Sequence, residues 1–190
     1  MALQPRKQHL IDTAYRLFNE FGYHATGIDR ILLESGVSKA TLYKHFRSKE
    51  ALILAVLEQR HTELTEQTEA GMSRARALGE PEVLAIFDGL DQWFQTKGFF
   101  GCNFINASAE YGQRGEAIHD FAALHKERLR CSLERSLQSA SPELKVELSE
   151  QLMMLFEGAI VSAHVRGKRN AAQVAKKAAQ RLVACHKSNP

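Results

Sequence analysis

Residues 26–50 constrain the fold of this chain most strongly, because their apolar side chains recur at helical spacing on both sides of a short turn. A helix is predicted to begin directly after Thr26, which fits a capping box with Asp29. Gly36 can take the left-handed conformation that ends a helix, and Ser38 can cap the next one. The pattern therefore predicts a helix-turn-helix.

The second helix of this segment, residues 39–46, has two different faces. Leu42 and Phe46 lie four residues apart and can bury against the first helix. The other positions include no acidic residue and carry side chains that grip phosphates and read base edges: Lys39, Thr41, Tyr43, Lys44 and His45. Double-stranded DNA is the expected partner. The alternative is an ordinary helix corner without DNA, since such corners are common in helical proteins.

The charge of the chain is unevenly placed along the sequence. Residues 1–50 hold eight Lys and Arg against five Asp and Glu, and this net of +3 equals the net charge of the whole chain. Residues 51–190 are therefore balanced. Positive charge beside the helix-turn-helix is what phosphate neutralisation needs, although an ordinary solvated surface could also carry it.

Composition excludes several other classes of protein. No apolar run reaches the roughly 18 residues of a membrane helix, and the N-terminus lacks the apolar core of a signal peptide. Three scattered cysteines, Cys102, Cys131 and Cys185, indicate a reducing cytoplasm. Neither Cys nor His shows metal-ligand spacing, and no phosphate-binding loop or nucleophile elbow occurs. We therefore predict a cytoplasmic protein that is not an enzyme, with no metal, cofactor or membrane contact.

Helical periodicity continues over the rest of the 190 residues, which predicts an all-α chain. Ser48 is expected to cap a long connecting helix, and Ser141 with Pro142 marks another helix start. The predicted domains are a helix-turn-helix DNA-binding domain over residues 1–50, with its connecting helix reaching about residue 70, and an effector-binding and dimerisation domain over residues 71–190. The helices are expected over residues 5–21, 28–35, 39–46, 49–76, 81–96, 107–111, 116–139, 142–166 and 171–183.

The last two predicted helices mix small residues with large apolar ones. Small residues let helices approach closely, so these helices are expected to pair with the same two helices of a second chain. The alternative is packing within one chain. A DNA-binding protein with one short recognition helix gains most of its sequence specificity by contacting two DNA half-sites as a dimer, which favours the homodimer.

The chain resembles the TetR family of transcriptional regulators. The signature Gly-Val-Ser-Lys-Ala-Thr-Leu-Tyr-Lys-His-Phe over residues 36–46, followed by Ser-Lys-Glu over residues 48–50, carries this resemblance, which runs from Leu10 to Leu57. At Gly27 many members of the family carry a hydroxyl residue that helps to hold a phosphate, which leaves Thr26 to supply this contact. The resemblance implies that the DNA contacts are Thr26, Lys39, Ala40, Thr41, Tyr43, Lys44, His45 and Lys49.

The resemblance also implies a small-molecule effector, of unknown identity, bound by the C-terminal domain. The candidate pocket residues are aromatic, sulfur-containing or polar side chains on apolar helices: Phe87, Trp93, Phe94, Phe100, Cys102, Phe104, Asn106, Tyr111, His125, Met153, Phe156, Glu157 and His164. Such side chains are core residues more often than ligand contacts. Cys102 could sense electrophiles or oxidants, with a buried, inert thiol as the alternative.

Together these observations predict a regulator, most simply a repressor. A homodimer would bind a near-palindromic DNA operator and release it when the effector binds. The alternative is a helical enzyme or interaction module in which the helix-turn-helix is only a scaffold.

Overall fold

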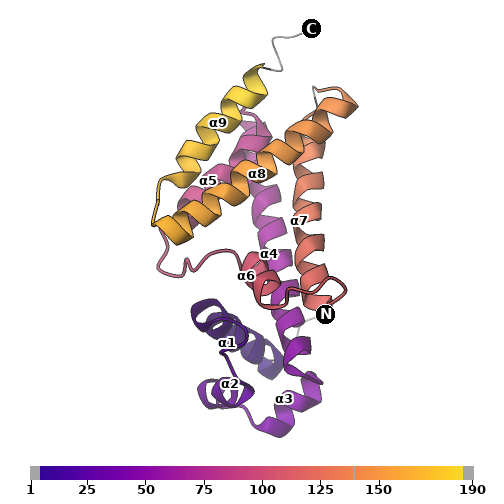
Figure 1. Cartoon of the computed structure of the whole chain (residues 1–190), viewed down its shortest axis with the longest axis vertical. Helices are drawn as coiled ribbons and strands as arrows, with labels where there is room; N and C mark the ends of the chain where they lie inside the picture. Colours follow the sequence, from indigo (N-terminus) through magenta and orange to yellow (C-terminus); the bar gives the residue numbers. More distant parts are fainter. Residues whose placement is uncertain (1–4, 139, 186–190) are drawn as a thin grey trace. The chain divides into compact units, whose positions relative to one another are not determined.

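The computed structural model describes residues 5–138 and 140–185, and within these residues helices are the only regular secondary structure (Figure 1). The predicted all-α class is confirmed. None of the described helices is both long and apolar enough to cross a bilayer. The elements are α1 (Pro5–Phe21), α2 (Ile28–Ser35), α3 (Lys39–His45), α4 (Lys49–Ala77), the 3-10 helix η1 (Glu82–Leu84), α5 (Ala85–Phe94), α6 (Asn103–Glu110), α7 (Ala117–Ser136), α8 (Pro142–Arg166) and α9 (Ala171–Cys185).

Serine side chains cap the first turn of three helices at the predicted positions. The Ser38 hydroxyl accepts a hydrogen bond from the Thr41 amide at 3.2 Å, and the Ser48 hydroxyl accepts one from the Ala51 amide at 3.2 Å. Ser141 caps α8 in the same way. These contacts satisfy backbone donors that the first turn of a helix leaves unpaired.

Three predicted elements differ in detail. The helix expected over residues 107–111 is α6, which already begins at Asn103. The helix expected over residues 81–96 begins as the 3-10 helix η1 and becomes α-helical only at Ala85. The helix expected over residues 116–139 is α7, which ends at Ser136; residue 139 lies outside the described residues. Differences of this size arise because helix ends depend on the local packing that a periodic pattern does not contain.

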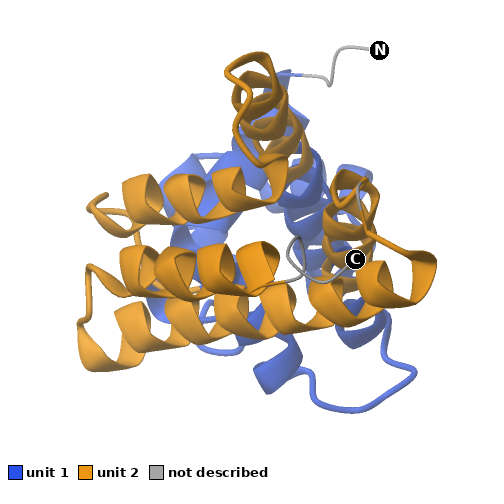
Figure 2. Cartoon of the chain, turned by 90° about the horizontal axis from the view of Figure 1, so that it is seen from above, with its two compact units in different colours: residues 1–62, 102–125 blue, residues 63–101, 126–190 orange. Residues whose placement is uncertain are grey.

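The chain forms two compact units, coloured separately in Figure 2. Unit 1 comprises residues 1–62 and 102–125, and unit 2 comprises residues 63–101 and 126–190. Helices α4 and α7 each contribute to both units. Unit 1 therefore includes α6, which follows the predicted DNA-binding domain by about fifty residues of chain. The functional domain boundary near residue 70 stays a prediction.

The core of unit 1 is built from the apolar faces of α1, α2 and α3. Leu10, Leu17 and Phe18 of α1 are buried, as are Ile31 of α2 and Leu42 of α3. Burial of such side chains contributes roughly 1.5–3 kcal/mol each, which fixes the angle between the helices of the turn.

One expected core residue of α1 lies at the surface. Phe21 is exposed, and the Arg30 guanidinium lies 3.7 Å from the centre of its ring. The helical spacing of Leu17, Phe18 and Phe21 predicts that all three are buried, and for Phe21 this prediction is wrong. The ring lies at the end of α1, where a cation–π contact covers it instead of the core.

Unit 2 is held by packing of α8 and α5 against α9. The small residues predicted to permit close helix approach are used inside this unit, since Ala163 of α8 and Ala172 and Ala179 of α9 are buried. Packing within one chain, the alternative to a dimer seam, is therefore what these alanines do. An interface with a second chain would have to use other residues of the same helices.

Candidate functional site

The turn between α2 and α3 has the geometry of a helix-turn-helix. Gly36 adopts the left-handed conformation (φ 64°), and its amide donates to the Leu32 carbonyl at 3.0 Å, which ends α2. The Val37 amide donates to the Ser35 hydroxyl at 3.3 Å, and Ser38 then starts α3. A residue with a Cβ would strain the backbone at Gly36, which explains why glycine is needed there.

Helix α3 buries one face and exposes the other. Leu42 and Phe46 are buried, as their spacing predicted. Lys39, Ala40 and Lys44 are exposed, and Tyr43 keeps 46% of its surface accessible. Two cations and a phenol thus share an uncovered helix surface, which is the chemistry that contacts phosphates and base edges.

The remaining predicted contacts on α3 are partly covered. Thr41 is half-buried, and its hydroxyl lies 2.9 Å from the Ser38 hydroxyl. His45 is half-buried, with its ring 6.4 Å from that of Phe46. Both side chains therefore also serve the local fold, whatever contact they make with DNA.

Thr26 is the clearest departure from prediction. Its side chain is completely buried, and the hydroxyl donates to the Gly22 carbonyl at 2.7 Å and to the Leu17 carbonyl at 3.2 Å. Helix α2 is capped at Gly27 without any side-chain hydrogen bond. The predicted capping box and the phosphate contact of the Thr26 side chain are both wrong, because the hydroxyl binds the end of α1 instead.

Lys49 also makes an internal contact. Its ammonium donates to the His24 carbonyl at 3.3 Å, and burial lowers the pKa of the ammonium from its ordinary value. The side chain ties the start of α4 to the loop before α2. A phosphate contact by Lys49 stays a prediction, and it would have to compete with this bond.

A residue that sequence reasoning missed organises the same loop. The Glu110 carboxylate, at the end of α6, accepts hydrogen bonds from the Tyr23 amide at 2.8 Å and the His24 amide at 2.5 Å. The His24 ring nitrogen Nδ1 lies 3.1 Å from the same carboxylate. A Cβ at Gly22, where φ is 86°, would lie 3.0 Å from the nearer Glu110 oxygen. The absence of a side chain at Gly22 therefore leaves room for the Glu110 carboxylate beside the backbone of the loop.

A second contact between α6 and this loop lies deeper in unit 1. The buried Tyr23 hydroxyl donates to the Asn103 carbonyl at 3.1 Å, and the ring stacks on Phe18 at 5.1 Å. The Asn103 side chain donates to Asn19 at 3.1 Å. Burial raises the pKa of Tyr23, so its hydroxyl stays a donor. No local pattern predicts the contacts of Asn103, since 80 residues separate it from Tyr23 and 84 separate it from Asn19.

We expect Glu110→Ala to lower the free energy of unfolding by about 2 kcal/mol, because the amides of Tyr23 and His24 lose a charged acceptor. Denaturant unfolding followed by circular dichroism measures this. Glu58→Ala is the matched control, since Glu58 is an exposed acid of the same unit. Equal unfolding curves for the two variants would show that the Glu110 contacts contribute nothing to stability.

The thirteen predicted effector residues are divided between the units. Cys102, Phe104, Asn106, Tyr111 and His125 lie in unit 1, and the other eight lie in unit 2. In unit 1, Phe104 and His125 are buried and their rings stack at 3.6 Å. The His125 nitrogen Nδ1 lies 2.9 Å from that of His61. Cys102 is buried as well, in keeping with the inert alternative.

The unit 2 members also contact other side chains. Phe87, Phe94 and Met153 are buried, and the Glu157 carboxylate lies 3.2 Å from the Lys126 ammonium. The exposed His164 ring covers the backbone of Gly101, where a Cβ would lie 3.1 Å from it. Trp93, Phe100 and Phe156 are half-buried. A ligand role for these residues stays a prediction.

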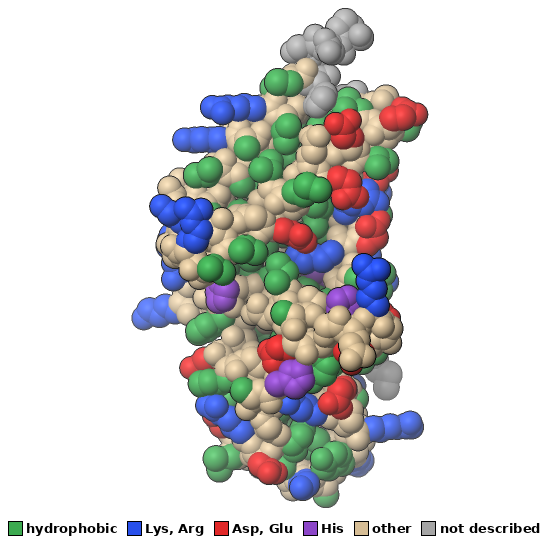
Figure 3. Space-filling view, viewed as in Figure 1, with side chains coloured by type: hydrophobic (Ala, Val, Ile, Leu, Met, Phe, Trp, Pro, Cys, Tyr) green, Lys and Arg blue, Asp and Glu red, His purple; other side chains and the backbone are tan. Residues whose placement is uncertain are grey.

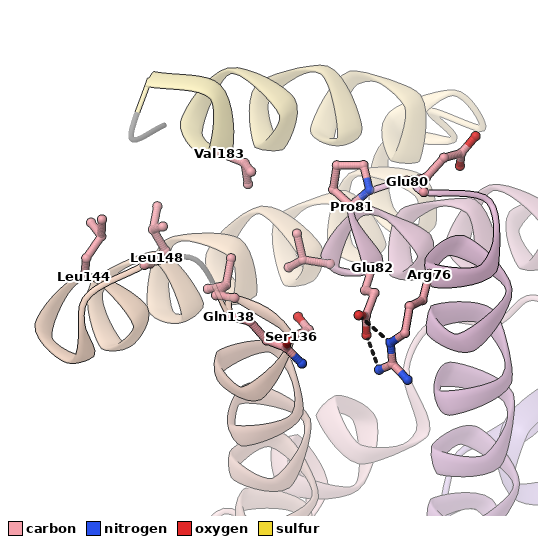
Figure 4. Close-up of a pocket in the computed structure, with 13 residues that line it drawn as sticks. Arg76, Glu80, Pro81, Glu82, Ser136, Gln138, Leu144, Leu148 and Val183 are labelled. Carbon is pink, nitrogen blue, oxygen red and sulfur yellow. Dashed lines mark hydrogen bonds and ion pairs between the residues drawn. The ribbon is translucent and has the colours of Figure 1, made fainter. Parts of the chain in front are cut away.

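A cavity lies elsewhere in unit 2. Its volume is about 750 Å³, and none of the thirteen residues lines it. Figure 4 shows Arg76 and Glu82 paired on one side and Leu144, Leu148 and Val183 on the other. The cavity lies among the ends of α4, α7 and α9, the start of α8, and η1. Within the described ranges, no group of three or more His, Cys, Asp or Glu side chains could hold a metal ion.

Comparisons with known proteins agree with this geometry. Residues 10–56 match the family described as bacterial regulatory proteins, tetR family. The transcriptional repressor NemR of Escherichia coli (strain K12) is 32% identical over 109 residues, which is 55% of this chain and 53% of NemR. The transcriptional activator FasR of Mycolicibacterium smegmatis is 50% identical over 58 residues, 30% of this chain and 26% of FasR. The matches thus span about half or less of these curated relatives.

Solved structures resemble almost the whole chain. SCO4454, a TetR-family transcriptional regulator from Streptomyces coelicolor, has a TM-score of 0.84 and 28% identity, with 97% of this chain and 98% of that chain covered. The reduced form of E. coli NemR has a TM-score of 0.82 at 20% identity, over 94% of this chain and 96% of that chain. At that identity the NemR likeness concerns the fold.

Proposed function

We propose, from the premise that this chain belongs to the TetR family of bacterial regulatory proteins, that it binds operator DNA and regulates transcription. The observation that carries the proposal is the uncovered face of α3. It presents Lys39, Ala40, Tyr43 and Lys44 with no acid among them, while Leu42 and Phe46 are buried and α3 packs against α1. Such a surface suits the major groove of DNA.

We assign the individual contacts by chemistry. Lys39, Ala40, Thr41 and Lys44 are proposed to face base edges, and Tyr43, His45 and Lys49 to contact phosphates. Since cations carry much of this interface, binding should weaken steeply with salt. A DNA-binding role also implies a cytoplasmic location.

Selection of operators from random duplexes tests this proposal. The purified chain is expected to enrich a near-palindrome whose half-sites lie about one helical turn, roughly 34–36 Å, apart. Affinity for the enriched site should fall at least about tenfold between 50 and 200 mM salt. Salt-sensitive binding without any enriched sequence would instead indicate a nonspecific basic surface, and would refute sequence reading by α3.

A homodimer through α8 and α9 is part of the proposal. Large apolar side chains stay exposed on these helices, including Met154, Val161 and Val165 of α8 and Val174 of α9. Figure 3 shows hydrophobic side chains over α8 among the polar ones. The three α8 positions follow one another at spacings of seven and four, so they form one stripe. Exposed apolar stripes of this kind mark interaction surfaces.

Repression with release by a small molecule completes the proposed mechanism. A dimer that covers an operator excludes other proteins from it, and an effector that prefers the DNA-incompetent form would shift the population away from DNA. Of the relatives, NemR is named a repressor and FasR an activator. Repression is the simpler role, because it needs only occupancy of the site.

A further inference from the structure

The cavity of unit 2 adjoins a second hollow of about 410 Å³. Arg76, Glu82, Ser136 and Gln138 line both, so these four side chains form a shared wall. Within that wall the Arg76 guanidinium donates to both oxygens of Glu82, at 2.7 and 2.5 Å. Each charge of this pair is thereby compensated by the other.

The two hollows differ in chemistry. The larger one has an apolar side formed by Leu144 and Leu148 of α8 with Val183 of α9 (Figure 4). Leu137 and Val83 add to this side. Its volume of about 750 Å³ lies within the range of roughly 300–1,000 Å³ that is typical of small-molecule sites. This side suits the hydrocarbon body of a ligand.

The smaller hollow is lined by an arginine, Arg135, whose charge is not compensated by the Arg76–Glu82 pair. Arg135 lines it together with the serines 73, 132 and 136, and among residues 5–138 and 140–185 Arg135 makes no ion pair. Arg135 is adjacent in sequence to Ser136 of the shared wall. Two acids line this hollow: Glu82, which is paired with Arg76, and Glu69, which lies seven residues from Arg76 along α4, or about 10 Å of helix.

We infer that these joined hollows bind an amphipathic carboxylate, with its apolar body against α8 and α9 and its head group at Arg135. Guanidinium groups bind carboxylates through two parallel hydrogen bonds, and the serine hydroxyls can donate to the same oxygens. If the chain regulates transcription as proposed, this ligand is its effector. Its head group would compete with Glu82 for Arg76, and so change how the end of α4 is held.

Calorimetric titration of the full chain with decanoate, without DNA, tests the site. We expect one decanoate per chain, bound at least about tenfold more tightly than decyltrimethylammonium, because only the carboxylate pairs with Arg135. Arg135→Gln should weaken decanoate binding by about tenfold or more. The matched control is Arg74→Gln, an exposed arginine of α4 outside both hollows, which should leave the affinity unchanged.

A second variant tests the apolar side. Ala140→Trp fills part of the larger cavity and should abolish decanoate binding, while circular dichroism and the melting temperature confirm the fold. Equal affinity for decanoate and the ammonium, or unchanged affinity in Arg135→Gln or in folded Ala140→Trp, would overturn the inference. Decanoate that binds as expected but does not release operator DNA would keep the site and reject only its role as effector site. Failure to bind any operator would instead count against the proposed function alone.

Discussion

The double variant Tyr43→Ala/Lys44→Ala is expected to bind the selected operator at least about 1,000-fold more weakly than the unchanged chain. Both side chains lie on the exposed face of α3, so their removal deletes DNA contacts without opening the core. Each lost contact with a base or phosphate costs roughly 1–3 kcal/mol, and a dimer loses each contact twice. Fluorescence anisotropy at fixed salt, with the operator and a scrambled duplex, measures the effect.

The control for this variant is Lys97→Ala, which removes an exposed lysine outside α3, α8 and α9. It changes the net charge of the chain by the same amount as Lys44→Ala, and its operator affinity should stay within about twofold of the unchanged chain. If the double variant bound the operator as well as this control, α3 would not be the reading helix. The single variants then separate the roles: Lys44→Ala should relax sequence preference, while Tyr43→Ala should weaken all duplexes alike.

The second large effect is expected at the proposed dimer interface. Val161→Asp/Val165→Asp should convert the dimer to a monomer of 21.3 kDa. In a two-fold interface the pair of substitutions places four carboxylates in an apolar contact, and each unpaired buried charge costs several kcal/mol. A monomer binds the two half-sites independently, so the operator affinity should fall by more than about 100-fold.

Light scattering coupled to size exclusion measures the mass, and Leu78→Asp is the matched control. Leu78 is 74% exposed, like Val165, but lies outside α8 and α9. Its substitution makes the same change of an exposed apolar residue to a carboxylate and should leave the dimer intact. Loss of the dimer in both variants would mean that added charge, and not the α8 stripe, is responsible.

Local features of the fold could be predicted because their causes lie within a few residues of one another. Ser38 and Ser141 cap helices that start directly after them, and Gly36 ends α2 in the left-handed conformation. The spacing of Leu42 and Phe46 gave the buried face of α3, and with it the exposed face that Lys44 shares. Side chains three or four residues apart on a helix are neighbours in any tertiary structure.

Contacts between distant segments needed the tertiary structure. Thr26 is a residue type that commonly caps helices. Its hydroxyl instead donates a hydrogen bond to the Leu17 carbonyl of α1, and the side chain is buried. Glu110 looks like any acid at the end of a short helix until the amides of Tyr23 and His24 lie beside it. Likewise, Phe104 fits a ligand pocket by composition but packs against His125 in a core.

The cavity of unit 2 also depends on the tertiary structure and not on local sequence. Its walls come from five elements between Arg76 and Val183, and nothing in the spacing of those residues announces a hollow. A helical pattern identifies which side chains point away from water, because periodicity is a property of one helix. Whether they then fill a core or line a space depends on how closely separate helices approach, and that is decided by the packing of the whole unit.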